Sequence, residues 1–232
     1  MKIALLGYGR MGKTIEKIAT ERGHEIVKKI DHGDAYEFSD AEVAIDFSVP
    51  DAAVQNISAA LKAGVPVVSG TTGWLEKYDD MVLLCEHHNS AFIYASNFSV
   101  GVNIFFELNK KLAQMMKTLK DYNVSMTEVH HIHKLDAPSG TAITLAEGII
   151  KETEHNDWIL DNNEAGKITI NAVREAEVPG THTVKYESQV DEIVIEHKAH
   201  NRNGFALGAI IAAEWLKDKK GVHTMKDVLN LS

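Results

Sequence analysis

The sequence predicts an α/β protein of two domains, one with a parallel sheet flanked by helices and one of α+β type. Three observations support this prediction. In roughly the first hundred residues, short apolar runs alternate with helical patterns, as they do in sheets built from βαβ units. After a long helical pattern, four strand patterns follow with one clear helix among them. The segment 203–219 is again strongly helical, and we expect it to fold back on the first domain.

The first domain should hold five strands. Residues 3–6 form an apolar run that ends at a glycine, and residues 10–21 carry apolar side chains at helical spacing. Asp51 is expected to cap the helix that contains Val54, Ile57 and Leu61. The remaining strands are expected at residues 25–31, 42–48, 66–70 and 91–96.

The second domain should hold an open, mostly four-stranded mixed sheet. A long helix is expected over residues 101–119 and a second one from about Gly140. The polar segment 153–166 is interpreted as a mobile loop. The strand patterns cover residues 121–130, 167–175, 181–188 and 192–199. The predicted boundaries are 1–99 with 203–232 for the first domain and 100–202 for the second.

Composition limits the function. The net charge of -9 argues against nucleic acid as a partner, because phosphate binding needs a basic face. The single cysteine, Cys85, excludes an internal disulfide and is interpreted as a buried apolar group. The N-terminal apolar run is too short for a signal peptide or a membrane span. We therefore expect a cytoplasmic protein with no membrane or nucleic-acid partner.

The stretch "GYGRMG" places Gly7, Gly9 and Gly12 in the G-x-G-x-x-G spacing. It follows a predicted strand and opens a predicted helix, so the helix start can hold a pyrophosphate. This context predicts a Rossmann-type dinucleotide-binding domain. The alternative is a tight turn that holds no ligand.

Asp31 ends the second predicted strand, 19 residues after Gly12. A carboxylate at this point can accept hydrogen bonds from the adenosine ribose and repels a 2′-phosphate. The next residue is His32 rather than an arginine. We therefore predict that NADH is preferred and NADPH tolerated.

Three further strand ends carry small or hydroxylated residues: "DFS" at 46–48, "GTTG" at 70–73 and "ASNF" at 95–98. Ligands of open α/β sheets bind at the carboxyl ends of the strands. These ends leave room for a ribose and a nicotinamide and can form hydrogen bonds with both. A plain loop at "GTTG" is the alternative.

The stretch "EVHHIHKLDAPSGTA" carries three histidines and a lysine within five residues. In a strand, His130 shares a face with Glu128, while His131 faces the other way. A zinc site needs ligands that converge on one point, and adjacent strand residues diverge, so we predict no metal. A metal site and a strand end with solvated histidines are the alternatives.

The residues that follow favour chemistry. A helix that starts near Gly140 and Thr141 can seat a carboxylate. Lys134 adds a cation and proton donor, and histidines change protonation near neutral pH. This combination indicates an acid-assisted site for a small anionic substrate. Together with a nicotinamide site, it suggests hydride transfer coupled to protonation.

On "GYGRMG", "GTTG", "SNFSVGVN" and "EVHHIHKLDAPSGTA", the sequence resembles the 4-hydroxy-tetrahydrodipicolinate reductase family, formerly called dihydrodipicolinate reductases. The resemblance covers most of the chain. It implies reduction of a cyclic 4-hydroxy imine dicarboxylate to tetrahydrodipicolinate, with loss of water, on the diaminopimelate route to lysine. It also implies a homotetramer built through the sheet of the second domain.

The resemblance further implies roles for individual residues. His130 and Lys134 match the catalytic proton donors of the family, and His131, Gly140 and Thr141 match its substrate-binding positions. The positions that match its cofactor site are Gly7, Tyr8, Gly9, Arg10, Met11, Asp31, Gly70, Thr71, Thr72, Ala95, Ser96, Asn97 and Phe98.

Two other functions compete with this interpretation. A different two-domain nicotinamide dehydrogenase would explain the glycine motif but not the segment from Lys134 to Thr141. A redox-sensing regulator would bind NADH without turnover, but the sequence shows no basic helix-turn-helix.

Overall fold

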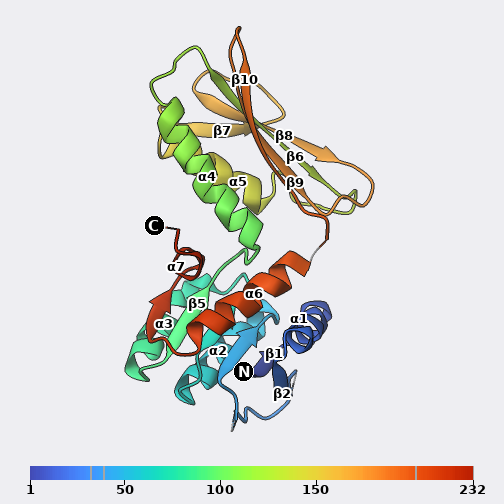
Figure 1. Cartoon of the computed structure of the whole chain (residues 1–232), viewed down its shortest axis with the longest axis vertical. Helices are drawn as coiled ribbons and strands as arrows, with labels where there is room; N and C mark the ends of the chain where they lie inside the picture. The colour runs from blue at the N-terminus through green and yellow to red at the C-terminus, as the bar shows by residue number, and fades with distance from the viewer. Residues whose placement is uncertain (32, 39, 202, 232) are drawn as a thin grey trace. The chain divides into compact units, whose positions relative to one another are not determined.

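The computed structural model describes residues 1–31, 33–38, 40–201 and 203–231. The chain divides into two compact units. The first unit is Met1–Val100 with Asn203–Ser232, and the second unit is Gly101–Arg202. Each unit contains one sheet (Figure 1).

The sheet of the first unit has six parallel strands in the order β11-β5-β4-β3-β1-β2. The strands are β1 (Lys2–Leu6), β2 (Glu25–Ile30), β3 (Val43–Asp46), β4 (Val67–Ser69), β5 (Ala91–Tyr94) and β11 (Gly221–His223). The helices are α1 (Arg10–Glu21), α2 (Pro50–Lys62), α3 (Tyr78–His87), α6 (Asn203–Leu216) and α7 (Met225–Leu229), with a short 3-10 turn η1 (Leu75–Lys77).

Both faces of this sheet are buried because alternate strand residues point to opposite sides. On β1, Ile3 and Leu5 join a core with α1, α6 and α7. Ala4 and Leu6 join a second core with α2 and α3. Helices therefore cover both faces, which is the doubly wound arrangement expected from the sequence.

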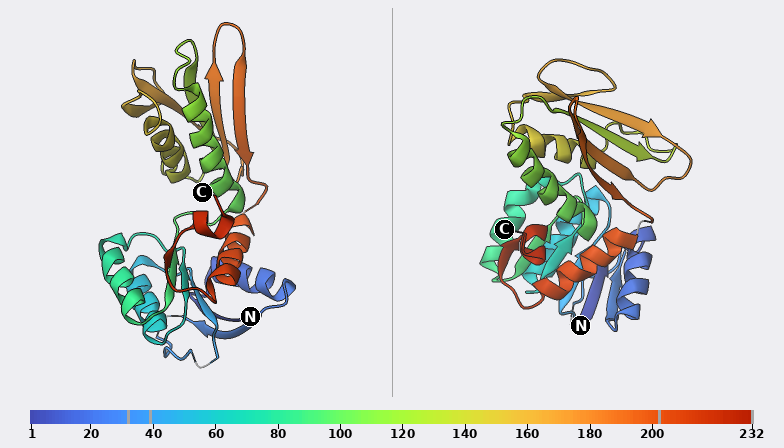
Figure 2. Two further views of the ribbon diagram at one scale, coloured as in Figure 1. Left: turned by 60° about the vertical axis from the view of Figure 1, so that its left-hand side comes forward. Right: turned by 45° about the horizontal axis from the view of Figure 1, so that its top comes forward.

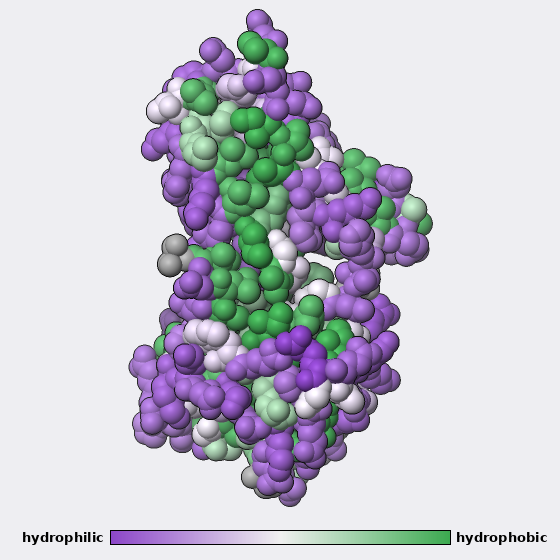
Figure 3. Space-filling model, in the orientation of Figure 1, coloured by the Kyte–Doolittle hydropathy of each residue, from purple (hydrophilic) through white to green (hydrophobic). Residues whose placement is uncertain are grey.

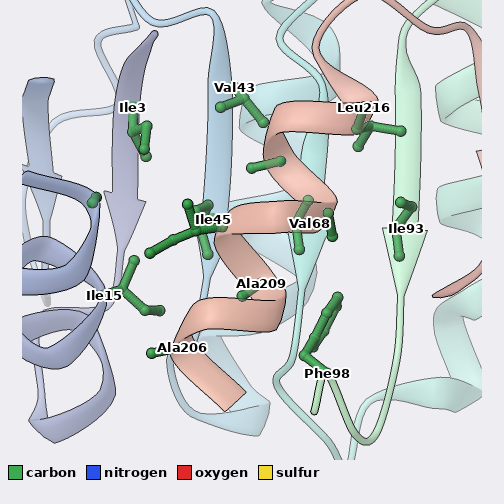
Figure 4. Close-up of a cluster of buried hydrophobic side chains, with 14 of the residues drawn as sticks. Ile3, Ile15, Val43, Ile45, Val68, Ile93, Phe98, Ala206, Ala209 and Leu216 are labelled. Carbon is green, nitrogen blue, oxygen red and sulfur yellow. The ribbon is translucent and has the colours of Figure 1, made fainter. Parts of the chain in front are cut away.

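Helix α6 lies against the middle of the sheet in the first core (Figure 4). Ala206 and Ala209 face the strand residues Ile45 and Val68, and small side chains let the helix approach closely. The closest approach is at Gly208, where an added Cβ would lie 1.7 Å from the carbonyl oxygen of Phe98.

The second unit has a five-stranded mixed sheet in the order β10-β9-β6-β8-β7. Its strands are β6 (Asn123–His130), β7 (Asp157–Leu160), β8 (Lys167–Arg174), β9 (Thr181–Glu187) and β10 (Glu192–Lys198). Strand β6 is central, parallel to β8 and antiparallel to β9. Helices α4 (Val100–Met116) and α5 (Gly140–Ile150) cover one face of the sheet (Figures 1 and 2).

Within the described part of the chain, no helix of this unit packs against the other face of the sheet. It carries Thr127, Thr169 and Thr183, together with Val173 and Val194, which are 39% and 47% exposed. Helix α4 also keeps an apolar flank that includes the exposed Ile104, Leu108 and Met115, and Figure 3 shows apolar side chains along it.

Three expectations about the strands are wrong in detail. Residues 157–160 are not loop but β7, so the second sheet has five strands rather than four. β7 is a short edge strand, only partly buried, so its surroundings look polar in sequence. β11 likewise adds a sixth strand to the first sheet.

Asp51 does not cap α2. The helix begins at Pro50, and its N-cap is Val49, which makes no side-chain hydrogen bond. Proline suits the first turn because its φ is already helical and the missing N–H would lack a helical partner. Asp51 lies in the first turn, where a carboxylate interacts favourably with the helix dipole.

Among the described residues, no helix is both long and apolar enough to cross a membrane.

Replacing Gly208 by alanine should lower the free energy of unfolding by about 3 kcal/mol or more, because a backbone carbonyl cannot move aside for a methyl group. Gly204→Ala is the matched control on the same helix, since its Cβ would make only an ordinary contact, 3.5 Å from Ser99 Oγ. Urea unfolding of both variants measures the difference. Equal stability of the two variants would contradict this packing of α6.

Candidate functional site

The order in which the chain adds strands to the first sheet reverses between β1 and β3, so the carboxyl ends of these two strands form its switch point. The chain leaves β1 into α1 on one face and β3 into α2 on the other. Ligands of doubly wound sheets bind in the crevice outside such a point. A cavity of about 640 Å³ lies here, lined by Gly7, Tyr8 and Gly9 after β1, by Asp31 and Asp34 after β2, and by Ser48 after β3.

The glycine loop at this cavity permits no side chain at two positions. Gly7 has a φ of +92°, and a Cβ there would lie 2.5 Å from the carbonyl oxygen of Phe47. A Cβ on Gly12 would lie 2.4 Å from the carbonyl oxygen of Gly7. The loop therefore folds tightly against the start of α1, which fits the pyrophosphate of a dinucleotide.

Tyr8 is held in place at the rim of the cavity. Its hydroxyl group donates to the Glu16 carboxylate and accepts from Lys29 Nζ at 3.1 Å. Lys29 Nζ also lies 4.4 Å from the centre of the Tyr8 ring, and it pairs with Glu16 at 2.7 Å. The ring thus forms a fixed wall beside the glycine loop.

A buried carboxylate organises the ends of β3 and β4. Asp46 accepts hydrogen bonds from Ser48 Oγ at 2.7 Å, Asn56 Nδ2 at 3.0 Å and Ser69 Oγ at 2.8 Å. Burial raises the pKa of Asp46, and these donors act against the rise. The Ser48 N–H donates to Thr71 Oγ1 at 2.8 Å. Asp46 thereby fixes side chains that line the cavity.

The other predicted cofactor residues are not all at the main cavity. Met11, Gly70, Thr71 and Thr72 line a smaller neighbouring cavity of about 190 Å³, which shares Phe47 and Ser48 with the first. Arg10 is exposed at the start of α1 and lines neither cavity.

The predicted residues at the end of β5 also line neither of these two cavities. The Ala95 N–H donates to Ser69 O at 3.2 Å, and Ser96 is exposed. Asn97 Oδ1 accepts from the Ser99 N–H at 2.9 Å. Phe98 belongs to the core beneath α6, 5.8 Å from the Phe47 ring. Residue 32, a histidine where an arginine would favour NADPH, lies outside the described residues.

In the second unit, the site is built around the end of β6. Val124, Met126, Glu128 and His130 alternate along the strand and point to the buried face. Register places His182 of β9 opposite Glu128, and Arg174 of β8 opposite His130.

The Glu128 carboxylate is fully buried and surrounded by donors. Both of its oxygens accept from the Ser139 N–H at 3.1 Å, and Oε1 also accepts from Arg174 Nη2 at 3.1 Å. Oε2 lies 3.4 Å from His130 Nδ1 and 3.7 Å from His182 Nε2. Burying a carboxylate is costly unless such partners are present.

Ser139 connects this carboxylate to α5. Its hydroxyl group lies 3.1 Å from His182 Nε2 and accepts from the Ala142 N–H at 3.2 Å, which makes it the N-cap of the helix. Gly140 and Thr141 follow as the first helical residues, as the sequence indicated. The helix start is therefore fixed next to Glu128.

Arg174 holds the segment that carries Lys134. It donates from Nε to Lys134 O at 3.3 Å and from Nη2 to Asp136 O at 2.6 Å. The Lys134 ammonium contacts both Asp136 oxygens, at 2.7 and 2.8 Å. These hydrogen bonds hold the pKa of Asp136 below its ordinary value. His131 lies in the turn after β6.

The two buried histidines favour their neutral forms. Burial lowers the pKa of His130, and the Glu128 carboxylate opposes this effect. The nearby cations Lys134 and Arg174 lower it further. Burial lowers the pKa of His182 to about 4, with His130 adding to the shift.

Comparison with known proteins identifies the family. Residues 1–98 match the family model "Dihydrodipicolinate reductase, N-terminus", and residues 101–229 match "Dihydrodipicolinate reductase, C-terminus". The chain belongs to the dihydrodipicolinate reductase family. This confirms the resemblance inferred from the sequence motifs.

Relatives in this reductase family align over the whole chain. The 4-hydroxy-tetrahydrodipicolinate reductase of Christiangramia forsetii is 58% identical, covering 99% of this chain and 98% of its own. That of Thermosipho africanus is 36% identical over the same shares. A dipicolinate-bound dihydrodipicolinate reductase from Paenisporosarcina sp. TG-14 has the same fold, with a TM-score of 0.81, 21% identity and 97% coverage of both chains.

The side chains of Glu128, His130 and His182 in this reductase could be mistaken for a metal centre, since one ligand atom of each lies within 4.8 Å of the others. However, Glu128 already accepts from Ser139 and from the Arg174 guanidinium. A divalent cation here would face the positive charge of Arg174. The residues fit a metal poorly, and its absence stays a prediction.

Sequence reasoning did not assign Ser139, Arg174 or His182 to the reductase site, and it included Asp46 only as part of the strand end "DFS". Arg174 and His182 lie 46 and 54 positions after Glu128, and only the strand register brings them together. The sequence did contain one indication. Glu128 and His182 lie at positions of β6 and β9 that alternate with exposed residues and face the core, where a charged or polar side chain requires a partner.

The His182 environment predicts a specific loss of stability in acid. The unfolded chain binds a proton at His182 below about pH 6.5, whereas the folded chain binds it only near pH 4. Stability from this residue is therefore present above pH 6.5 and falls by about 3 kcal/mol as the pH drops towards 4. His182→Asn should remove this component. Urea unfolding from pH 7.5 to 4 measures it, and a constant difference between variant and wild type would contradict it.

Proposed function

We propose that the chain catalyses the NAD(P)H-dependent reduction of 4-hydroxy-tetrahydrodipicolinate to tetrahydrodipicolinate, with loss of water, on the diaminopimelate route to lysine. The observation that carries this proposal is that His130 lies beside the buried Glu128 at the start of α5, while Arg174, which pairs with Glu128, also holds the backbone of Lys134. Relatives that align over the whole chain bear the name of this reductase.

In this proposal the two units have different roles. The first unit, with the cavity at the ends of β1 and β3, binds the cofactor. The second unit binds the substrate and mediates assembly. Gly140 and Thr141 at the start of α5, together with His131, hold a carboxylate of the substrate, because helix starts and cations attract anions.

The reduced nicotinamide supplies a hydride to one carbon of the substrate ring. A neighbouring position must gain a proton, which His130 or Lys134 donates. Lys134 enters the reaction from its ion pair with Asp136, so a substrate carboxylate has to compete with that side chain for the ammonium group. Water leaves as the hydroxyl group of the hydroxylated carbon and a hydrogen of its neighbour, which the donated proton replaces, and the product is tetrahydrodipicolinate.

NADH is the preferred cofactor and NADPH is tolerated. Both Asp31 and Asp34 line the cavity after β2, and Asp34 Oδ2 accepts from the Asp31 N–H at 2.9 Å. Two carboxylates at this edge repel a 2′-phosphate and suit ribose hydroxyl groups.

The functional protein is a cytoplasmic homotetramer in this proposal. The open face of the second sheet supports the assembly, because it exposes Val173 and Val194 among threonines and has β10 at its edge. Apolar side chains in a flat, exposed sheet are typical of a surface that pairs with another copy.

The test is consumption of NADH when substrate is generated in situ from pyruvate and aspartate semialdehyde. His130→Ala and Lys134→Ala should each lower turnover by about 10²–10⁴-fold with the fold intact, because each removes an acid-base group. His133→Ala is the matched control, since this exposed imidazole of the same motif pairs with Glu177, lies 6.1 Å from the His131 ring centre and has no proposed role in the reaction.

NADH binding without consumption by the wild-type protein would indicate a regulator and would refute the proposal. Turnover that survives in both alanine variants would refute the assignment of the two residues.

Cofactor choice has a separate test. Wild-type kcat/KM should be higher with NADH than with NADPH, and Asp31→Asn should raise the NADPH/NADH ratio by about tenfold, because one repulsive charge is removed. Glu37→Gln, an exposed carboxylate of the same segment outside the cavity, is the control. A wild-type preference for NADPH, or an unchanged ratio in Asp31→Asn, would contradict the role of Asp31.

A further inference from the structure

The two oxygens of Glu128 face different partners. Oε1 lies 3.1 Å from the Arg174 guanidinium, which balances the negative charge. Oε2 is directed towards the imidazoles of His130 and His182, whose ring centres are 5.0 Å apart. Oε2 also accepts from the Ser139 N–H at 3.1 Å, and since a carboxylate oxygen has two lone pairs it keeps one for a further N–H donor.

The His130 ring presents its two nitrogens to different surroundings. Nδ1 is buried and has no hydrogen bond within the described part of the chain, although Glu128 Oε2 lies at 3.4 Å. Catalytic hydrogen bonds are often this long without substrate and shorten when it binds. Nε2 lies on the side of Gly180, where an added Cβ would come within 3.1 Å of it.

We propose that Glu128 is a positioning residue whose carboxylate accepts the Nδ1–H of His130, so that Nε2 is the atom that transfers the proton. This inference rests on the proposed function, which makes His130 a proton donor. In the transfer, the Nε2–H bond breaks and its proton goes to the substrate. His130 is left neutral, with its remaining proton on Nδ1 and facing Glu128.

Charged and titratable groups surround His130 from every neighbouring element. Glu128 lies on its own strand, Arg174 on β8 and His182 on β9. Lys134 and Asp136 approach from the segment after β6. Among these groups, Glu128 is the stronger of the two that favour the protonated imidazole, so its removal should make His130 a weaker base.

The first experiment compares Glu128→Gln with Glu147→Gln, the same change at an exposed position of α5 in the same unit. Protonated His130 is the donor, so kcat/KM falls as the pH rises through its pKa. Without the Glu128 charge this fall should begin about one pH unit lower, which is about a tenfold loss of activity on the alkaline side. Glu147→Gln should leave the profile unchanged.

A second measurement does not depend on substrate. The titration of the His130 ring, followed by NMR, should move to lower pH in Glu128→Gln and remain in place in Glu147→Gln. Loss of the carboxylate leaves Arg174 without its buried partner, so this variant is checked for native circular dichroism. Glu128→Asp retains the charge in the pocket, and both the titration and the activity profile should then lie between wild type and Glu128→Gln.

A double-variant cycle completes the test. If Glu128 acts through His130, Glu128→Gln/His130→Ala should be no slower than His130→Ala alone. Two results would overturn the inference and leave Glu128 a purely structural residue. In the first, the losses of activity in the two single variants multiply in the double variant. In the second, Glu128→Gln lowers kcat uniformly while the pH profile and the His130 ring titration stay in place. A wild-type protein without turnover would refute the proposed function, while the ring titrations would still decide the role of Glu128.

Discussion

The buried carboxylate of Glu128 is the interaction on which the second unit depends. An unpaired carboxylate in an apolar interior is strongly unfavourable, so the fold must supply donors from several directions. Two come from separate parts of the chain, the Ser139 N–H before α5 and Arg174 on β8, and the imidazoles of His130 and His182 lie 3.4 and 3.7 Å from the same carboxylate. The contacts that balance this charge fix the start of α5 and the segment that holds Lys134, beside the ring of His130. Folding and the arrangement of proton-handling groups thus share one physical cause.

The first unit also contains a buried carboxylate that orders the side chains around it. Asp46, buried at the end of β3, collects hydrogen bonds from Ser48, Asn56 and Ser69, and so fixes the residues beside the cavity. In each unit a buried acid lies near the end of a central strand, next to side chains for which we propose ligand binding. The two differ in their partners. Neutral donors surround Asp46 and burial raises its pKa, whereas the cation Arg174 balances Glu128. The first arrangement suits a scaffold for a cofactor, and the second suits control of a neighbouring imidazole.

Much of this architecture could be predicted from the sequence because it is encoded locally. The apolar run before Gly7 and the glycine spacing indicated β1, the tight loop and α1, and the helical pattern from about Gly140 marked the start of α5. What was missed depends on contacts between distant segments. β7 is a four-residue edge strand whose structure comes from pairing with β8. Arg174 and His182 reach Glu128 through the strand register, which alternation alone does not determine. Phe98, which its place at a strand end and the family resemblance put at the cofactor site, has its side chain in the core beneath α6, and its cofactor role stays a prediction.

The most direct test of the central claim is the protonation state of the two His130 nitrogens in the wild-type protein, read from the nitrogen shifts of protein labelled with ¹⁵N at histidine. If Glu128 holds the ring through Nδ1, neutral His130 carries its proton on Nδ1, and Nε2 is the nitrogen that gains and loses a proton as the pH changes. If neutral His130 carries its proton on Nε2 instead, the carboxylate does not orient the ring, and the account of this site is contradicted.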